Sequence, residues 1–295
     1  MSDVLKSRVT ANKAMNFNAQ QNGYIPPAAV KTYPGLATDK GSTTFLAAVV
    51  SFQMDCGLTA DGFFGLRTQQ MLTQRFAPLE DFLVIGGVRT PIDTAGKFSI
   101  LDYTEDSRLD LHSFGNFSKR KKPVQRVVLH HGGYDPFHLA AVFATRDRKV
   151  SSHLGLGFTD SGDILVAQYL DLSHTAWHAG KMNEGSIGID FAVQPTTDCA
   201  RRYNLPIIKN PSTIGPAMVL EFPDRLLDAM AQLLQELHRV FELGAVTPMP
   251  EADMRYDPSA HEKITVLGHH HFATNGKFDV SYIWDRLNQR FTSPS

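Results

Sequence analysis

The sequence predicts a mixed α/β domain, a sheet flanked by helices, over residues 124–295, preceded by a small helical unit. Three observations support this prediction. The apolar, β-branched run at 127–129 is typical of a buried strand. Residues 150–158 and 164–170 are predicted to be two more strands, joined by a segment of Thr, Asp, Ser and Gly that is typical of a hairpin turn. Residues 224–243 have apolar positions at helical spacing and form the clearest amphipathic helix.

Composition places the chain among ordinary globular proteins. Its 295 residues are 42% apolar and 20% charged, which suffices for one large domain or two unequal ones. The formal net charge of −1 provides no overall field that would attract nucleic acid. The two cysteines, Cys56 and Cys199, do not indicate a disulfide framework and are compatible with synthesis in a reducing compartment.

Signals for export and membrane insertion are missing from the sequence pattern. Residues 1–30 are polar and lack the continuous apolar segment of a signal peptide. No apolar run approaches the ~20 residues that span a bilayer. We therefore expect a soluble protein that does not insert into membranes and does not use the general secretory route.

The N-terminal region is predicted in two parts. Residues 1–39 are rich in Asn, Gln, Lys and Ala, and we expect an N-terminal arm that is partly ordered at best. A helical domain over residues 40–80 should follow. Helix-spaced apolar residues at 42–53 predict its first helix, and a second short helix is expected at 66–72.

The helical domain contains a set of residues in a fixed order. They are Phe52-Gln53, Gly57-Leu58, Asp61-Gly62, Phe64-Gly65 and Thr68. In this order they resemble the peptidoglycan-binding domain 1 family, a small all-α, three-helix module. The resemblance covers residues 40–76 and implies that four of these residues serve in wall binding: Phe52, Gln53, Asp61 and Phe64. The alternative is a helical hairpin that only packs against the larger domain.

The stretch 81–123 is interpreted as a linker or lead-in. Gly86-Gly87 and Pro91 interrupt it, and it ends in the basic run Ser118-Lys-Arg-Lys-Lys-Pro123. Such a run is usually a solvated segment, and contact with an anionic cell-envelope polymer is the alternative. We place the domain boundary between residues 76 and 90, because the second domain could recruit part of this stretch.

Further elements are predicted within residues 124–295. The amphipathic helix at 224–243 has a proline near its start and a glycine just past its end, as helix termini prefer. The others are a helix at 136–148, a strand at 186–193 and a short strand at 264–267.

Segment 268–279, which follows the last predicted strand, offers three adjacent imidazoles, an ammonium and a carboxylate. Neutral imidazole and ionised carboxylate are good zinc ligands, and a catalytic zinc typically takes three protein ligands and leaves a fourth position for water. This segment could supply two ligands. The strand that ends at His130 and His131 is the best source of a third, because a strand end holds a side chain rigidly.

Four separated segments now form a pattern. They are Val128-Leu-His130-His131; Val150-Ser-Ser-His153; Ala176-Trp177-His178-Ala-Gly180 with Asn183 and Ser186-Ile-Gly-Ile-Asp190; and Gly268-His269 with Lys277 and Asp279. Their order and spacing over residues 124–287 resemble the zinc N-acetylmuramoyl-L-alanine amidases related to phage lysozyme-type amidases and peptidoglycan recognition proteins. The resemblance implies that zinc is held by His130, His269 and Asp279.

Amide hydrolysis needs an activated water and stabilisation of a developing oxyanion. Zinc supplies both, because it lowers the pKa of bound water toward ~7 and polarises the carbonyl. Lys277 could place a positive charge beside the oxyanion. Asp190 is the candidate for orienting or deprotonating the water. Relatives carry an acidic residue there, usually Glu, and some use a tyrosine near the 150–153 segment, where this chain has Ser152 and Leu154.

Other polar residues near these motifs have two interpretations. The expected substrate-binding residues are Trp177, His178, Asn183 and His153, because the Trp-His-Ala-Gly motif of relatives borders the muropeptide groove. Packed, hydrogen-bonded or turn-capping roles stay open for them. Three further histidines are not expected to bind metal. We expect His131 to support the site or to be structural, and His270 and His271 to be exposed or supporting. Only one of two adjacent strand residues faces a given side, and Asp279 already completes the ligand set.

Together these resemblances imply a two-domain peptidoglycan hydrolase. The N-terminal module would raise the local substrate concentration for a zinc amidase that cuts the amide between N-acetylmuramic acid and L-alanine of the stem peptide. The setting resembles that of a phage endolysin, made in the host cytoplasm and released to the wall by a separate permeabilising protein. We expect a monomer that binds bacterial peptidoglycan. The alternatives are a muropeptide-recycling amidase, a non-catalytic peptidoglycan receptor and a zinc hydrolase of another amide.

Overall fold

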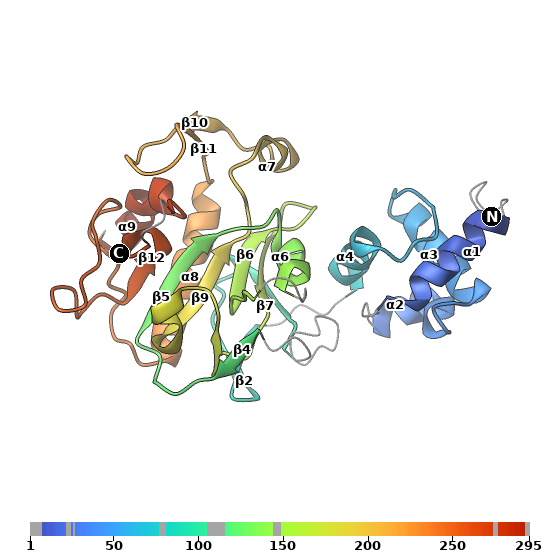
Figure 1. Ribbon diagram of the computed structural model, residues 1–295, viewed down its shortest axis with the longest axis horizontal. Coiled ribbons are helices and arrows are strands. Elements are labelled where there is room, and N and C mark those ends of the chain that lie inside the picture. The colour runs from blue at the N-terminus through green and yellow to red at the C-terminus, as the bar shows by residue number, and fades with distance from the viewer. Residues whose placement is uncertain are drawn as a thin grey trace. The chain divides into compact units, whose positions relative to one another are not determined.

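The structure is a computed structural model, which describes residues 8–21, 25, 27–76, 81–104, 116–143, 149–273 and 277–292. The chain divides into two compact units (Figure 1). The first comprises residues 1–78 with 106–110, and the second comprises 79–105 with 111–295. Within the described residues, no helix combines the length and apolarity needed to cross a membrane.

The described part of the first unit is helical. Its elements are α1 (Arg8–Ala19), α2 (Pro27–Thr32), the 3-10 helix η2 (Pro34–Ala37), α3 (Thr43–Asp55) and α4 (Leu66–Phe76). Ser42 caps the start of α3, because its hydroxyl accepts a hydrogen bond from the Phe45 N–H. Buried side chains of α3 form the core of the unit together with Phe64 and Leu72.

The described part of residues 8–39 is not the irregular arm expected at 1–39. The buried side chain of Asn18, in α1, donates to the Gly62 carbonyl at 2.9 Å and accepts from the Phe64 N–H at 2.7 Å. Tyr33 donates to the Asp55 carboxylate at 2.6 Å. The polar composition suggested disorder, but these polar groups pair with distant turns, so α1 and α2 belong to the helical unit.

The second unit is built on a six-stranded sheet in the order β12-β5-β9-β6-β7-β3. These strands are β3 (Ser99–Asp102), β5 (Arg126–His131), β6 (Leu154–Phe158), β7 (Ile164–Gln168), β9 (Ser186–Phe191) and β12 (Val266–Gly268). All neighbouring pairs are parallel except the β6–β7 hairpin. The predicted mixed α/β class is therefore confirmed.

Helices and small strand pairs surround this sheet. The helices are α6 (Pro136–Phe143), η3 (Gly180–Gly185), α7 (Thr197–Tyr203), α8 (Asp224–Val240), η4 (His269–His271), η5 (Ser281–Ile283) and α9 (Trp284–Thr292). The paired strands are β1 (Phe82–Ile85) with β2 (Val88–Pro91), β4 (Phe117–Lys119) with β8 (His174–Ala176), and β10 (Ile207–Lys209) with β11 (Met218–Leu220).

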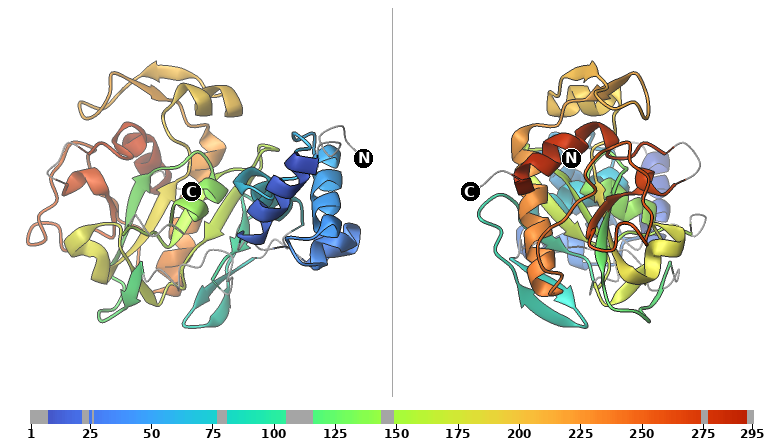
Figure 2. Two further views of the ribbon diagram at one scale, coloured as in Figure 1. Left: turned by 45° about the vertical axis from the view of Figure 1, so that its right-hand side comes forward. Right: turned by 90° about the vertical axis from the view of Figure 1, so that its left-hand side faces the viewer.

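Helix α8 runs along one face of the sheet (Figure 2). Six residues of its predicted apolar stripe are fully buried in the core: Leu226, Leu227, Met230, Leu233, Leu234 and Leu237. The last two, Val240 and Phe241, are partly buried and pack against that core. Each fully buried side chain contributes roughly 1.5–3 kcal/mol relative to an exposed one. Residues 144–148, expected to continue the helix at 136, lie outside the described residues.

The stretch 81–104 is part of the second unit, in contrast to the linker expected over 81–123. Strand β3 pairs with β7 and forms one edge of the sheet. The buried Gln168 amide bonds both the N–H and the carbonyl of Val84, each at 2.8 Å, and so ties β1 to the sheet. The strands β1, β2 and β3 have four residues each, too few to show a clear alternation. The basic run is not simply solvated either, because Arg120 donates to the Ser186 carbonyl at 3.1 Å.

Asp171 holds the turn between β1 and β2. Its carboxylate accepts the N–H groups of Gly86 at 2.8 Å and Gly87 at 2.6 Å, and that of Ser173 at 2.7 Å. Both glycines have positive φ, at 62° and 75°. Burial acts to raise the pKa of Asp171, but the hydrogen bonds from Ser173, Gly86 and Gly87 outweigh it and hold the pKa below its ordinary value.

The substitution Asp171→Asn should lower the free energy of unfolding of the second unit by about 1–2 kcal/mol at neutral pH, because three N–H groups lose a charged acceptor. A depressed carboxyl pKa stabilises the fold above the unfolded-state pKa, and this contribution disappears as pH falls through the folded-state pKa. The difference between wild type and variant should therefore shrink below about pH 4. Denaturant titrations followed by tryptophan fluorescence would measure it, since both tryptophans, Trp177 and Trp284, lie in this unit. A difference that stays constant down to pH 3 would contradict this account.

Candidate metal centre

Three parallel strands position the central residues. Strand β5 lies between β12 and β9 and runs in the same direction as both, so their carboxyl ends lie at one edge of the sheet. Strand β5 ends with His130 and His131, and His269 directly follows β12. Asp190 lies opposite His130 in the β5–β9 register. In open α/β sheets this edge is where ligands bind.

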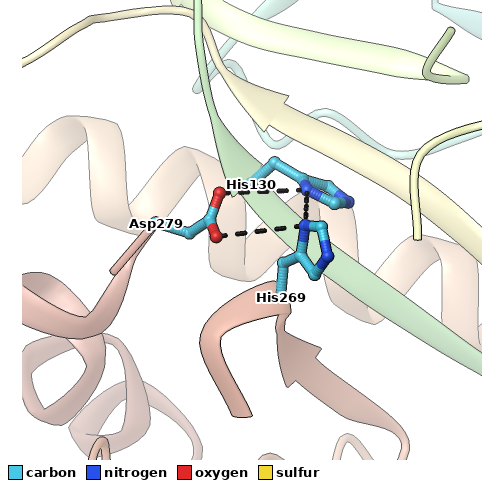
Figure 3. A group of neighbouring side chains, drawn as sticks. All are labelled: His130, His269 and Asp279. Carbon is cyan, nitrogen blue, oxygen red and sulfur yellow. Dashed lines mark hydrogen bonds and ion pairs between the residues drawn. The ribbon is translucent and has the colours of Figure 1, made fainter. Parts of the chain in front are cut away.

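His130, His269 and Asp279 face one another (Figure 3). The Nδ1 atoms of His130 and His269 are 3.1 Å apart. The Asp279 carboxylate places Oδ1 3.9 Å from Nδ1 of His130 and Oδ2 4.0 Å from Nδ1 of His269. His130 and Asp279 are buried, and His269 is partly exposed. One ligand atom from each residue thus lies within 4.8 Å of the others.

This donor set fits a tetrahedral divalent metal such as zinc. Zinc binds imidazole nitrogen and carboxylate oxygen at about 2.0–2.2 Å, which places neighbouring ligand atoms roughly 3–3.5 Å apart. Oδ2 of Asp279 is buried and has no hydrogen-bond partner among the described residues, so a cation would satisfy it. Asp279 also has a positive φ of 32°, an uncommon backbone conformation that clusters at functional sites.

The surroundings keep the imidazoles neutral, the form in which they bind metals. Burial lowers the pKa of His269 to about 4, and the charge of Lys277 acts in the same direction. Burial and the neighbouring His178 and His269 rings hold the pKa of His130 well below its ordinary value. Burial raises the pKa of Asp279 to about 6, against the charge of Lys277.

A second carboxyl group, Asp190, borders this centre. Burial raises the pKa of Asp190 to about 7, although the neighbouring Ser152 side chain acts against the shift. The charge of Asp279 contributes to raising it, so the two carboxyl groups are close. A carboxyl group that titrates near neutrality can both accept and donate a proton there.

Most of the second unit matches a known protein family. Residues 120–281, more than half of the chain, match the N-acetylmuramoyl-L-alanine amidase family. The chain belongs to this family. Its second unit therefore has a peptidoglycan-amidase type of function.

Several solved structures are similar to this chain. The catalytic domain of PlyG is 14% identical with a TM-score of 0.40, covering 66% of this chain and 99% of that one. The Ph2119 endolysin from Thermus scotoductus MAT2119 bacteriophage Ph2119 is 17% identical with a TM-score of 0.35, covering 66% and 99%. Drosophila PGRP-LB is 14% identical with a TM-score of 0.36, covering 67% and 98%. No curated protein matches the chain.

Lys277 is exposed, and its charge acts on the residues of the candidate metal centre. Its charge lowers the pKa values of His130, His269 and Asp279, and also that of Asp190. The structure thus brings the expected ligands together with both expected catalytic residues.

The three histidines expected to support the site differ in their surroundings. His131 neighbours Asp279: the His131 backbone acts to lower the pKa of the Asp279 carboxyl, and the Asp279 backbone acts to raise that of the His131 ring. His270 and His271 are both buried, so neither is exposed. Nδ1 of His271 accepts the Gly268 N–H at 2.9 Å, which fixes the backbone just before the ligand His269. Nε2 of His271 donates to the Glu251 carbonyl at 3.2 Å.

The substrate-binding role expected of His153 does not fit its position. The side chain is fully buried, its Nδ1 accepts the Gly188 N–H at 2.9 Å, and its Nε2 lies 3.0 Å from the His174 carbonyl. Arg120 also approaches Nε2 of His153, at 3.1 Å. His153 is therefore a packed structural histidine. Arg120 has no motif signature, because its role depends on partners more than 30 residues away.

Two other expected substrate contacts also have internal roles. Oδ1 of Asn183 accepts the N–H groups of His178 at 3.1 Å and Ala179 at 2.6 Å, so it caps the turn that carries them. Nδ1 of His178 lies 2.9 Å from Nε2 of His130, behind the metal-facing side of that ring. Trp177 is partly exposed and stays the candidate for a substrate contact.

The residues expected to bind the wall lie in the first unit and divide into two pairs. Phe52 and Phe64 are fully buried core residues, so their rings cannot contact a polymer. Gln53 and Asp61 line a pocket of about 380 Å³, together with Arg67 and other residues. The buried Gln53 amide donates to Asp61 at 2.9 Å and accepts the Gly62 N–H at 2.9 Å, so it organises the pocket wall.

Removing one ligand should abolish metal retention. We expect His130→Ala and Asp279→Ala to lose zinc during gel filtration, because two remaining ligands do not form a closed site, whereas wild type retains about one ion per chain. His271→Gln is the matched control, because the nitrogens of His271 bond backbone groups. Metal analysis by mass spectrometry would decide, and equal zinc content in all four proteins would show that other residues bind it.

Proposed function

We propose that the second unit is a zinc-dependent N-acetylmuramoyl-L-alanine amidase that cleaves the amide between N-acetylmuramic acid and L-alanine of the stem peptide. The observation that supports this most is the convergence of His130, His269 and Asp279 at the carboxyl edge of the sheet, where Oδ2 of Asp279 has no partner in the described part of the chain. We infer the substrate class from the family and the identity of the metal from the donor set.

In this mechanism His130, His269 and Asp279 would hold the metal. When bound, zinc supplies an acidified water and a Lewis acid for the substrate carbonyl. Asp190 removes a proton from the attacking water and later delivers it to the amine of the leaving L-alanine. The Lys277 ammonium stabilises the negative charge that develops on the carbonyl oxygen. The products are a free carboxyl group on the lactyl ether and a new amino terminus.

The decisive assay is release of L-alanine amino termini from purified sacculi. We expect release by the full-length protein, its loss on adding a chelator, and its recovery on adding zinc. A protein that pellets with sacculi but releases no amino termini would be a peptidoglycan-binding protein without this activity.

Asp190→Asn should reduce the rate of release by roughly 10²–10⁴-fold, because an amide cannot act as the general base. Zinc content should stay unchanged, since Asp190 is not among the proposed ligands. Asp163→Asn is a matched control in the β6–β7 turn, where the carboxylate accepts a hydrogen bond from Ser161. An Asp190→Asn protein with wild-type activity would remove this residue from the mechanism.

We further propose that the first unit anchors the enzyme to peptidoglycan and that the protein acts as a monomer. The polar pocket formed by Gln53, Asp61 and Arg67 supports the anchoring role. The proposed setting is endolysin-like: synthesis in a host cytoplasm, with access to the wall opened by a separate permeabilising protein. Lysis of cells only when a permeabilising protein is co-expressed would test that setting.

Arg67→Glu should weaken co-sedimentation with sacculi severalfold, because it places a negative charge in the pocket opposite a carboxylate-bearing polymer. Lys31→Glu makes the same charge change at an exposed position of α2, outside the pocket, and should leave sedimentation unchanged. Equal sedimentation of the two variants and wild type would place wall binding elsewhere.

A further inference from the structure

A chain of hydrogen bonds runs from the back of His130 into the protein. Nε2 of His130 lies 2.9 Å from Nδ1 of His178. Nε2 of His178 lies 3.3 Å from the Ser186 hydroxyl, which lies 2.6 Å from the Met182 carbonyl. The two rings meet edge-on, with centroids 5.1 Å apart and planes at 84°, which allows an N–H in one ring plane to point at a nitrogen of the other.

The Met182 carbonyl, at the end of this series of hydrogen bonds, determines the direction of every bond in it. A backbone carbonyl only accepts, so Ser186 must donate its single proton to Met182. The Ser186 oxygen can then only accept, and Nε2 of His178 must be the donor. A neutral imidazole carries one N–H, which leaves Nδ1 of His178 as an acceptor. Nε2 of His130 therefore donates, and Nδ1 of His130 carries a bare lone pair toward His269.

We propose that His178 and Ser186 are positioning residues that hold His130 in the tautomer with an unprotonated Nδ1, and that they thereby set the metal affinity of the site. The proposal rests on the proposed metal at His130, His269 and Asp279. A ligating histidine almost always donates its second N–H to a fixed partner, which sets the tautomer and the ring orientation. Here that partner is an imidazole whose own tautomer is fixed by a hydroxyl.

The backbone around His178 is arranged to hold its ring in place. A Cβ atom on Gly188 would lie 2.6 Å from Cγ of His178, closer than atoms can approach, so β9 needs a glycine there. Asn183 fixes the backbone of His178 from the other side, through the 3.1 Å bond to its N–H. The Ser-Ile-Gly-Ile segment at 186–189 thus supplies both the hydroxyl that fixes the tautomer and the space for the ring.

Zinc affinity of the full-length protein tests the proposal, measured by competition with a chromophoric chelator. His178→Leu removes the acceptor and should weaken zinc binding about 10–100-fold. His178→Asn can place an amide oxygen near the position of Nδ1 and should recover most of this loss. Ser186→Ala should cause a smaller loss in the same direction. His238→Leu is the control, because it removes another buried imidazole of the same unit, one bonded to Leu234 and Thr265.

A second readout reports the tautomer itself. Two-bond ¹H–¹⁵N spectra of the zinc-free protein should show His130 protonated on Nε2 in wild type, and a mixture of tautomers in His178→Leu and Ser186→Ala. Unfolding followed by tryptophan fluorescence would identify a variant that fails to fold. If His178→Leu does not fold, Ser186→Ala still tests the proposal.

The outcomes separate this proposal from the proposed function. If wild type binds no zinc, the metal-dependent function fails, and the tautomer spectra still decide whether the chain fixes His130. If wild type binds zinc, and both His178→Leu and Ser186→Ala bind it equally well, the positioning role is overturned. An Nδ1-protonated His130 in the wild-type spectrum would also overturn it.

Discussion

The parallel pairing of β5 with β12 on one side and β9 on the other determines where the functional side chains lie. Because the three strands run in one direction, their carboxyl ends place His130, Asp190 and His269 at a single edge of the sheet. Asp279 joins them from the segment that leads into η5. One strand running in the opposite direction would move its side chain to the far end of the sheet, and the ligand set would be incomplete.

Burial gives this cluster its chemical character. The same loss of solvent keeps the imidazoles neutral and raises the pKa values of Asp190 and Asp279. Such a cluster would be unfavourable without partners, since buried polar groups are costly when unpaired. One hydrogen bond reduces that cost, because the His178 ring bonds His130. Within the described residues Oδ2 of Asp279 has no hydrogen-bond partner, and it lies 4.0 Å from Nδ1 of His269, where a cation would complete the arrangement.

Buried amides perform a comparable task in the two units. In the first, Asn18 and Gln53 pair with backbone groups of the 61–65 turn and hold it against α3. In the second, Gln168 ties β1 to the sheet edge through Val84. In each case a polar side chain bonds backbone N–H and carbonyl groups of a segment that is too short to pair them with its own backbone.

The sequence by itself determined the α/β class and helix α8, because hydrophobic periodicity is a local property that a chain shows without its fold. Ligand chemistry indicated the histidine-rich segment and the strand end at His130, and the full ligand set followed from the resemblance to the amidase family. Only the tertiary structure decided the roles of His153, His178, Asn183, Phe52 and Phe64, and the membership of residues 81–104 and of the described part of 8–39 in folded units. The physical reason is that burial and hydrogen-bond partners come from distant segments. His178 acts on a residue 48 positions away, and Asn18 on a turn 44 positions away. A motif shows that such a residue is present, but the face it occupies depends on strand pairing and packing.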